Sequence, residues 1–201
     1  MEDNIEPVSR SSNLINASDC FIIIIDVQSK FMLGLTNEER LIFLKKYNHI
    51  IRLSHVLKIP LIITAEDIQK NDSIPVSIQS TLPPNVQIYD KFIYSCWGQK
   101  DIQKGIIQMK NTQRLVAVLC GFETDVCIAQ TAIDLQANGY KVVILTDMTF
   151  SRNEIEHEIG LKRMEHHGII LSLLKTWQEE ITAGVKTGIL YMLKENGLHN
   201  I

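Results

Sequence analysis

Short, continuously apolar runs recur along this chain and constrain its fold more than any other feature. The run at residues 21–25 is a phenylalanine followed by four isoleucines. A strand that is apolar at every position, rather than at every second one, is typical of a sheet covered on both faces. Such runs predict six strands, at residues 21–27, 61–65, 86–89, 115–121, 142–146 and 169–173.

Stretches with helical signals lie between these runs. Thr36 and Glu39 have the spacing of a capping box, and Leu44, Tyr47 and Ile51 after them share one helix face. Further helices are predicted at residues 101–110, 125–137, 153–166, 175–181 and 183–201. Regular alternation of strands and helices predicts an α/β protein, a three-layer α/β/α sandwich with a mostly parallel six-stranded central sheet.

The length of 201 residues predicts one domain. Residues 1–19 are polar, rich in Ser and Asn and without an apolar core, which predicts a flexible N-terminal arm and no signal peptide. The domain is expected at residues 20–182. Residues 183–201 are expected to form a C-terminal helical extension of that domain.

Composition narrows the function classes. The net charge of −3, with no basic run, argues against a nucleic-acid partner, and the longest apolar run is too short to cross a membrane. Four cysteines without a CxxC pair predict reduced thiols and a cytoplasmic location. The histidines lack metal-ligand spacing and no glycine-rich nucleotide loop is present, so no metal and no cofactor are expected.

Three reactive side chains follow three different predicted strands. Asp26 closes the first, Lys91 follows the third, and Cys127 lies about one turn into the helix after the fourth. Ligands of open α/β sheets bind at the carboxyl ends of the strands, so these groups are expected to meet. A helix N-terminus that Thr124 caps would favour a thiolate and hold an oxyanion. Taken singly, the three residues also fit a buried thiol, a helix-capping carboxylate and a surface lysine.

Residues 20–181 resemble the isochorismatase-like cysteine hydrolases. The resemblance rests on Ile25-Asp26-Val27-Gln28, on Lys91, on the Gly-x-x-Thr-Asp-x-Cys turn at residues 121–127, on Leu145-Thr146-Asp147 and on Ser151-Arg152. It implies a catalytic triad of Asp26, Lys91 and Cys127, a small-molecule substrate, and a homo-oligomer that is a dimer or larger.

The resemblance also implies an oxyanion-binding turn at Phe122, Glu123 and Thr124, with a cis peptide bond between Phe122 and Glu123. Two departures from the family's motifs indicate which branch of the family the chain resembles. The family's nicotinamidases carry an Asp-x-His metal motif where this chain has Asp-Ile-Gln at residues 67–69, and its true isochorismatases lack the cysteine. The chain therefore resembles the metal-free, cysteine-bearing branch.

The activity expected from these residues is hydrolysis of a small amide, carbamoyl or related C–N substrate through a thioester on Cys127. One alternative is vinyl-ether hydrolysis of the isochorismatase type, with Asp26 as general acid and no nucleophile. A second alternative is a non-catalytic or redox-sensing protein, because a reactive thiol also suits a sensor.

Four residues are expected to line the substrate pocket because they follow strand ends: Gln28, Phe31, Trp97 and Phe150. For the two phenylalanines, packing against the core is an equally good interpretation. Apolar residues at 185, 189, 190, 192 and 193 and the position of Trp97 near the expected pocket fit contacts with a second subunit.

Overall fold

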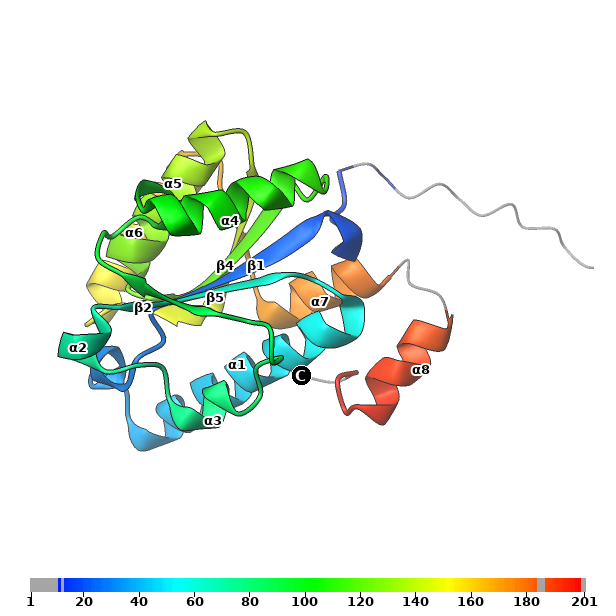
Figure 1. Cartoon of the computed structure of the whole chain (residues 1–201), viewed down its shortest axis with the longest axis horizontal. Helices are drawn as coiled ribbons and strands as arrows, with labels where there is room; N and C mark the ends of the chain where they lie inside the picture. Colours follow the sequence, from blue (N-terminus) through cyan, green and yellow to red (C-terminus); the bar gives the residue numbers. More distant parts are fainter. Residues whose placement is uncertain (1–10, 12, 184–186, 200–201) are drawn as a thin grey trace, which may run out of the picture.

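The computed structural model describes residues 11, 13–183 and 187–199. They form an α/β/α sandwich around a six-stranded, all-parallel sheet with the strand order β3-β2-β1-β4-β5-β6 (Figure 1). The predicted three-layer fold is confirmed. The strands are β1 (Cys20–Ile25), β2 (Leu61–Glu66), β3 (Ile88–Lys91), β4 (Val116–Phe122), β5 (Lys141–Phe150) and β6 (Ile170–Ser172).

Helices cover both faces of the sheet. One face carries α1 (Asn37–Leu57), α3 (Val76–Gln79), α7 (Leu174–Thr182) and α8 (Thr187–Glu195), and the other carries α4 (Lys100–Asn111), α5 (Ala129–Ala137) and α6 (Glu154–His166) (Figure 1). The short helix α2 (Ile68–Asn71) follows β2, and 3-10 turns lie at Ala17–Asp19, Ser29–Met32 and Cys96–Gly98. The predicted capping box of α1 is present, because Thr36 Oγ1 accepts from the Glu39 N–H and the Glu39 carboxylate accepts from the Thr36 N–H.

The central strand β1 explains why the apolar runs do not alternate. Ile22 and Ile24 pack in the cluster beneath α1 and α7, whereas Ile23 and Ile25 pack in the cluster beneath α4, α5 and α6. All four side chains are fully buried. A strand buried on both faces needs apolar residues at every position, because each face buries half of them.

Three of the differences from the predicted boundaries bear on the site. The β5 strand continues past residue 146 to Phe150, because Thr149 and Phe150 pair with the end of β4. The β3 strand is shifted two residues along, so it includes Lys91. The helix predicted at 125–137 is two pieces, a π-helical turn at Thr124–Ile128, here called the 124–128 turn, followed by α5.

Both ends of the domain contact its body. Ile15 is buried and its N–H donates to the Glu180 carboxylate at 2.7 Å, so the packed chain begins within the predicted arm, whose residues 1–10 and 12 lie outside the described residues. In the predicted C-terminal extension, Leu193 and Leu198 are buried in the cluster that includes α1, while 184–186 and 200–201 are not described. Among the described residues, no helix is both long and apolar enough to cross a membrane.

Gly121 permits the close approach of β4 to β1. Its φ is +131°, and a Cβ at this position would lie 1.9 Å from the carbonyl oxygen of Ile25. Only glycine adopts this conformation readily, and only glycine leaves the space. The strand ends that carry Asp26 and the 124–128 turn are therefore adjacent because residue 121 has no side chain.

We expect Gly121→Ala to lower the free energy of unfolding by more than about 3 kcal/mol, because both the φ angle and the backbone contact forbid a methyl group. The control is Gly188→Ala in α8, where no atom lies within 4 Å of the added carbon. That variant should gain about 0.5 to 1 kcal/mol from helix propensity. Urea denaturation measures both, and equal stability of the two variants would contradict the prediction.

Candidate active site

Asp26 and Lys91 form a buried ion pair at the carboxyl end of the sheet. Lys91 Nζ lies 2.8 Å from Asp26 Oδ2, and both side chains are 0% exposed. Asp26 follows β1 with a φ of +51°, a left-handed conformation that aspartate adopts more readily than most residues. Its second oxygen, Oδ1, accepts a hydrogen bond from Thr64 Oγ1 at 2.7 Å. Each oxygen of this buried carboxylate therefore has a polar partner.

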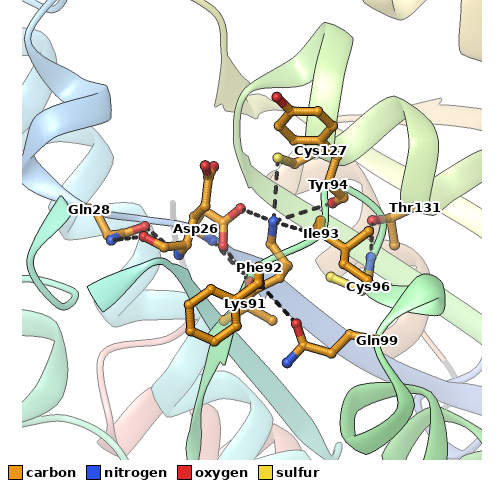
Figure 2. A network of polar contacts seen from close by, with 12 residues as sticks. Asp26, Gln28, Lys91, Phe92, Ile93, Tyr94, Cys96, Gln99, Cys127 and Thr131 are labelled. Carbon is orange, nitrogen blue, oxygen red and sulfur yellow. Dashed lines mark hydrogen bonds and ion pairs between the residues drawn. The ribbon is translucent and has the colours of Figure 1, made fainter. Parts of the chain in front are cut away.

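Cys127 lies beside this ion pair. Lys91 Nζ is 3.5 Å from Cys127 Sγ, and it also donates to the carbonyl oxygens of Ile93 at 3.0 Å and Tyr94 at 3.3 Å (Figure 2). The thiol is 4% exposed. The structure thus brings Asp26, Lys91 and Cys127 from three strand ends into mutual contact, with the ammonium between the carboxylate and the sulfur.

Burial changes the acidity of all three groups. Burial raises the pKa of Asp26, and the nearby Lys91 ammonium opposes this rise. Burial also raises the pKa of the Cys127 thiol, and the Asp26 carboxylate raises it further, while Lys91 lowers it. Burial alone would lower the pKa of Lys91, but Asp26 and Cys127 outweigh burial and the net shift is upward. The arrangement therefore combines a charged ammonium, a carboxylate more basic than in water, and a protonated thiol.

This result corrects the expected effect of the helix N-terminus on the thiol. Thr124 makes no capping hydrogen bond, because Glu123 occupies the N-cap position and Thr124 Oγ1 instead lies 2.8 Å from His157 Nδ1. The thiol of Cys127 is buried beside a carboxylate, and both conditions favour its protonated form. A thiolate at this position requires that a neighbouring group takes the proton.

The start of the 124–128 turn is anchored to the segment that follows β5. Ser151 Oγ donates to Asp125 Oδ1 at 2.6 Å, and Arg152 Nε donates to Glu123 Oε1 at 3.0 Å. Helix α6 lies against the same turn, because a Cβ on Gly160 would lie 2.7 Å from Asp125 Cα. The peptide bond between Phe122 and Glu123 is cis. Side chains and backbone contacts from β5 and α6 therefore fix the direction in which this turn leaves β4.

A cavity of about 780 Å³ opens next to the three-residue cluster. Its lining includes Phe31, Glu66, Tyr94, Val126 and Arg152. Glu66 and Val126 connect the cavity to the cluster, because Glu66 approaches the sulfur and Val126 directly precedes Cys127. A larger cavity of about 850 Å³ lies at the opposite ends of the strands, between the end of α1 and β3. Asp26, Lys91 and Cys127 are buried and line neither cavity.

Of the four residues predicted to line the substrate pocket, one lines the cavity and three do not. Phe31 lines the cavity. Gln28 does not, because its side chain is fully buried and its amide bonds to the backbone of Glu66. Trp97 packs edge-on against Tyr140 under α4 and α5, with ring centroids 6.1 Å apart, and is not among the described residues that line the cavity.

Phe150, the fourth predicted pocket residue, also lies outside the cavity lining. Its ring packs against Phe43, with centroids 6.5 Å apart, and against the His157 imidazole. Proximity to a strand end did not distinguish aromatic residues that face the cavity from those that pack beneath it. For Phe150, packing against the core is the interpretation that fits its contacts.

Several site residues were missed by the sequence analysis: Thr64, Glu66, Tyr94 and His157. Glu66 lies at the end of a predicted strand, and this position is the one signal that would have selected it. Oxygen atoms of Asp26 and Glu66 and the sulfur of Cys127 lie within 4.8 Å of one another. This set is a poor cation site, because the Lys91 ammonium already lies 2.8 Å from Asp26 and repels a second positive charge.

The fold and this cluster together define an α/β/α protein of the hydrolase type. The family model described as the isochorismatase domain matches residues 20–175. The chain belongs to the isochorismatase family, and the resemblance inferred from its motifs is confirmed. One relative, isochorismatase family protein 2A of Dictyostelium discoideum, is 32% identical over 81% of this chain and 82% of its own length.

Solved structures with the same fold share less of the sequence. The MAR1 ribonuclease of Caenorhabditis elegans has a TM-score of 0.80 at 21% identity and covers 90% of this chain and 91% of its own. YcaC of Escherichia coli, described as an octameric hydrolase of unknown specificity, has a TM-score of 0.79 at 18% identity, with coverage of 94% and 92%. The nicotinamidase PncA of Bacillus subtilis has a TM-score of 0.63 at 18% identity, with coverage of 77% and 99%.

The buried ion pair leads to a prediction about stability and pH. Lys91→Met leaves Asp26 as an unpaired buried charge and should cost about 3 kcal/mol at about pH 8. Because burial already raises the pKa of Asp26 and the variant lacks the opposing ammonium, the folded variant binds a proton more tightly than the unfolded chain does. The deficit should therefore shrink as the pH falls to about 5.

The control is the double variant Asp26→Asn with Lys91→Met, which removes both charges. It should recover to within about 1 kcal/mol of the wild type. Urea denaturation at the two pH values measures all three proteins. A Lys91→Met variant that is equally destabilised at both pH values would show that an unpaired Asp26 charge is not the cause.

Proposed function

We propose that the protein hydrolyses a small amide, carbamoyl or related C–N substrate through a thioester on Cys127. The observation that carries the proposal is the contact of one ammonium with both a carboxylate and a thiol, at 2.8 Å and 3.5 Å, next to a cavity. These are the groups that nucleophilic catalysis by a cysteine needs: a nucleophile, a base that takes its proton, and a cation that stabilises the charges.

In the first half of the reaction, Asp26 takes the proton of the Cys127 thiol as the sulfur attacks the substrate carbonyl carbon. The raised pKa of Asp26 makes this carboxylate a stronger base, and the raised pKa of the thiol means that attack and proton transfer proceed together. Backbone N–H groups of the 124–128 turn hold the oxyanion. The C–N bond then breaks, and the leaving nitrogen takes the proton from Asp26, which leaves a thioester.

In the second half, water attacks the thioester and Asp26 takes a proton from that water. The C–S bond breaks, the sulfur recovers the proton from Asp26, and the carboxylic or carbamic acid leaves. Lys91 remains protonated throughout, held by the carbonyl oxygens of Ile93 and Tyr94, and stabilises the negative charge on Asp26 and on the sulfur. The cycle consumes one water and requires no further group.

Incubation with a panel of small primary amides and carbamoyl compounds, followed by mass spectrometry, tests this mechanism. We expect an acyl adduct on Cys127, and a loss of turnover of at least about a thousandfold in Cys127→Ala. The matched control is Cys20→Ser at the opposite end of β1, which should retain full activity.

The outcomes also separate the alternatives. Full turnover by Cys127→Ala would contradict the thioester mechanism, and pyruvate release from isochorismate by Cys127→Ser would favour vinyl-ether hydrolysis. Reversible oxidation of Cys127 by peroxide without any hydrolysis would favour a redox sensor. The structure weighs against a sensor, because sensor thiols are exposed and acidic, whereas this thiol is 4% exposed and its pKa is raised.

We also propose that the chain acts as a homo-oligomer, a dimer or larger. Support comes from the three residues that follow Lys91. The large side chains of Phe92, Ile93 and Tyr94 are all exposed, and Tyr94 lines the cavity. The octameric state printed for YcaC is a property of that relative, and it is consistent with this proposal. Because two carbonyl oxygens of this exposed segment hold Lys91, contact with a second copy would also steady the ammonium.

Light scattering at micromolar concentration should give a mass of at least twice 22.9 kDa. Phe92→Asp introduces a charge at an exposed position and should shift the protein toward the monomer, with little change in its thermal unfolding. The control is Ile155→Asp, an equally exposed apolar residue on α6. A fully active wild-type monomer would contradict the proposal.

A further inference from the structure

Three hydrogen bonds from two buried side chains hold the backbone of Glu66 at the end of β2. The Gln28 side chain accepts from the Glu66 N–H at 2.7 Å and donates to the Glu66 carbonyl oxygen at 2.9 Å. Asn71 Nδ2 donates to the same oxygen at 3.1 Å. Gln28 and Asn71 are themselves buried, so residue 66 is one of the most firmly positioned points on the rim of the cavity.

The Glu66 side chain is held less firmly than its backbone. Within the described part of the chain, no side chain or N–H donates to its carboxylate, which is half-buried and lines the cavity. Burial raises its pKa, and the Lys91 ammonium lowers it from a distance. A firmly held backbone that carries a carboxylate without a hydrogen-bond donor is what a ligand-contacting residue requires.

The Glu66 carboxylate lies close to the sulfur, and this position determines which part of a bound substrate the carboxylate can contact. A Glu66 oxygen lies within 4.8 Å of Cys127 Sγ and of an Asp26 oxygen. A carbonyl carbon ready for attack lies about 3 to 3.5 Å from the nucleophile, so a group bonded to that carbon on the side facing Glu66 is within hydrogen-bond reach of the Glu66 carboxylate. Asp26 is less available for this contact, because its side chain is fully buried, Thr64 donates to its Oδ1, and the Lys91 ammonium lies 2.8 Å from its Oδ2.

We propose that Glu66 is a substrate-contacting, specificity-determining residue that accepts a hydrogen bond from an N–H group attached to the reacting carbonyl. The proposal rests on the proposed function and adds a residue that selects among its substrates. The preferred substrates are primary amides and carbamoyl compounds with a free NH₂ group, and anionic carboxylates are rejected. An oxygen anion in the place of that NH₂ group would face the Glu66 carboxylate with a like charge and no proton to share.

Two thiol reagents of nearly equal size test the proposed role of Glu66 without requiring that the protein hydrolyse a substrate. Iodoacetamide carries an NH₂ group on its carbonyl carbon, and iodoacetate carries an oxygen anion at the same position. The ratio of their alkylation rates at Cys127, measured by peptide mass spectrometry, cancels any change in the acidity of the thiol. We expect the ratio of iodoacetamide to iodoacetate to fall at least about tenfold in Glu66→Gln, because glutamine both accepts from an amide and donates to a carboxylate.

A second variant, Glu66→Met, removes the acceptor while retaining most of the side-chain length, and its ratio should fall as well. The matched control is Asp67→Asn, which removes one negative charge from the next residue. Asparagine preserves the capping role that Asp67 has on α2 and suits the φ of +42° at this position. The ratio in this control should stay within about twofold of the wild type.

The outcomes separate this inference from the proposed function. A ratio that is unchanged in both Glu66 variants overturns the role of Glu66, even if the wild type hydrolyses amides through Cys127. A ratio that falls equally in the Glu66 variants and in Asp67→Asn also overturns the role of Glu66, because the loss of any nearby negative charge would then explain the change in the ratio. A fall confined to the Glu66 variants supports it, and this result stands even if no acyl adduct on Cys127 is ever found.

Discussion

The contact between Lys91 and Asp26 is the interaction on which the candidate site depends. Removing an ammonium and a carboxylate from water costs several kcal/mol for each ion. Their mutual attraction offsets this desolvation free energy only when the geometry is good and further hydrogen bonds are present. The structure supplies both: a 2.8 Å contact, the Thr64 hydroxyl on the carboxylate, and two carbonyl oxygens on the ammonium. These partners belong to β1, β2 and the segment after β3, so one ion pair ties three strand ends together.

The same pair determines how the thiol behaves. Cys127 lies beside a carboxylate in a dry site, where burial and Asp26 raise its pKa and Lys91 only partly opposes them. A resting thiolate would place two negative charges beside one ammonium. In the mechanism that we propose, the thiol stays protonated until a substrate carbonyl is present to accept the electron pair of the sulfur, and Asp26 then gains the proton. This limits reaction with water-borne oxidants and agrees better with a hydrolase than with a redox sensor.

Much of the fold and of the three-residue cluster could be predicted from the sequence. The physical reasons also explain why some pocket residues were placed wrongly. Strand ends in a parallel sheet share one edge, so residues that follow apolar runs are neighbours whatever separates them in the chain. This reasoning brought Asp26, Lys91 and Cys127 together and placed Phe31 on the cavity. It could not tell which way a side chain points. Gln28, Trp97 and Phe150 lie at or after strand ends, yet their side chains contact other residues and do not line the cavity. The π-helical geometry at Thr124 depends on contacts with α6 and β5, which no local pattern reports.

Gln28 shows why a residue can matter to a site that it does not line. A buried amide is costly unless its hydrogen-bonding groups are satisfied, and this one satisfies them largely on the backbone of Glu66, at the point where β2 ends. The side chain thereby continues the hydrogen bonding of β2 past the last residue that pairs with β1, and it holds Glu66 at the cavity. The site accordingly has two parts. In the mechanism that we propose, the fully buried part, Asp26 with Lys91, provides the charges for bond breaking. The half-exposed part, led by Glu66, contacts the substrate at the cavity.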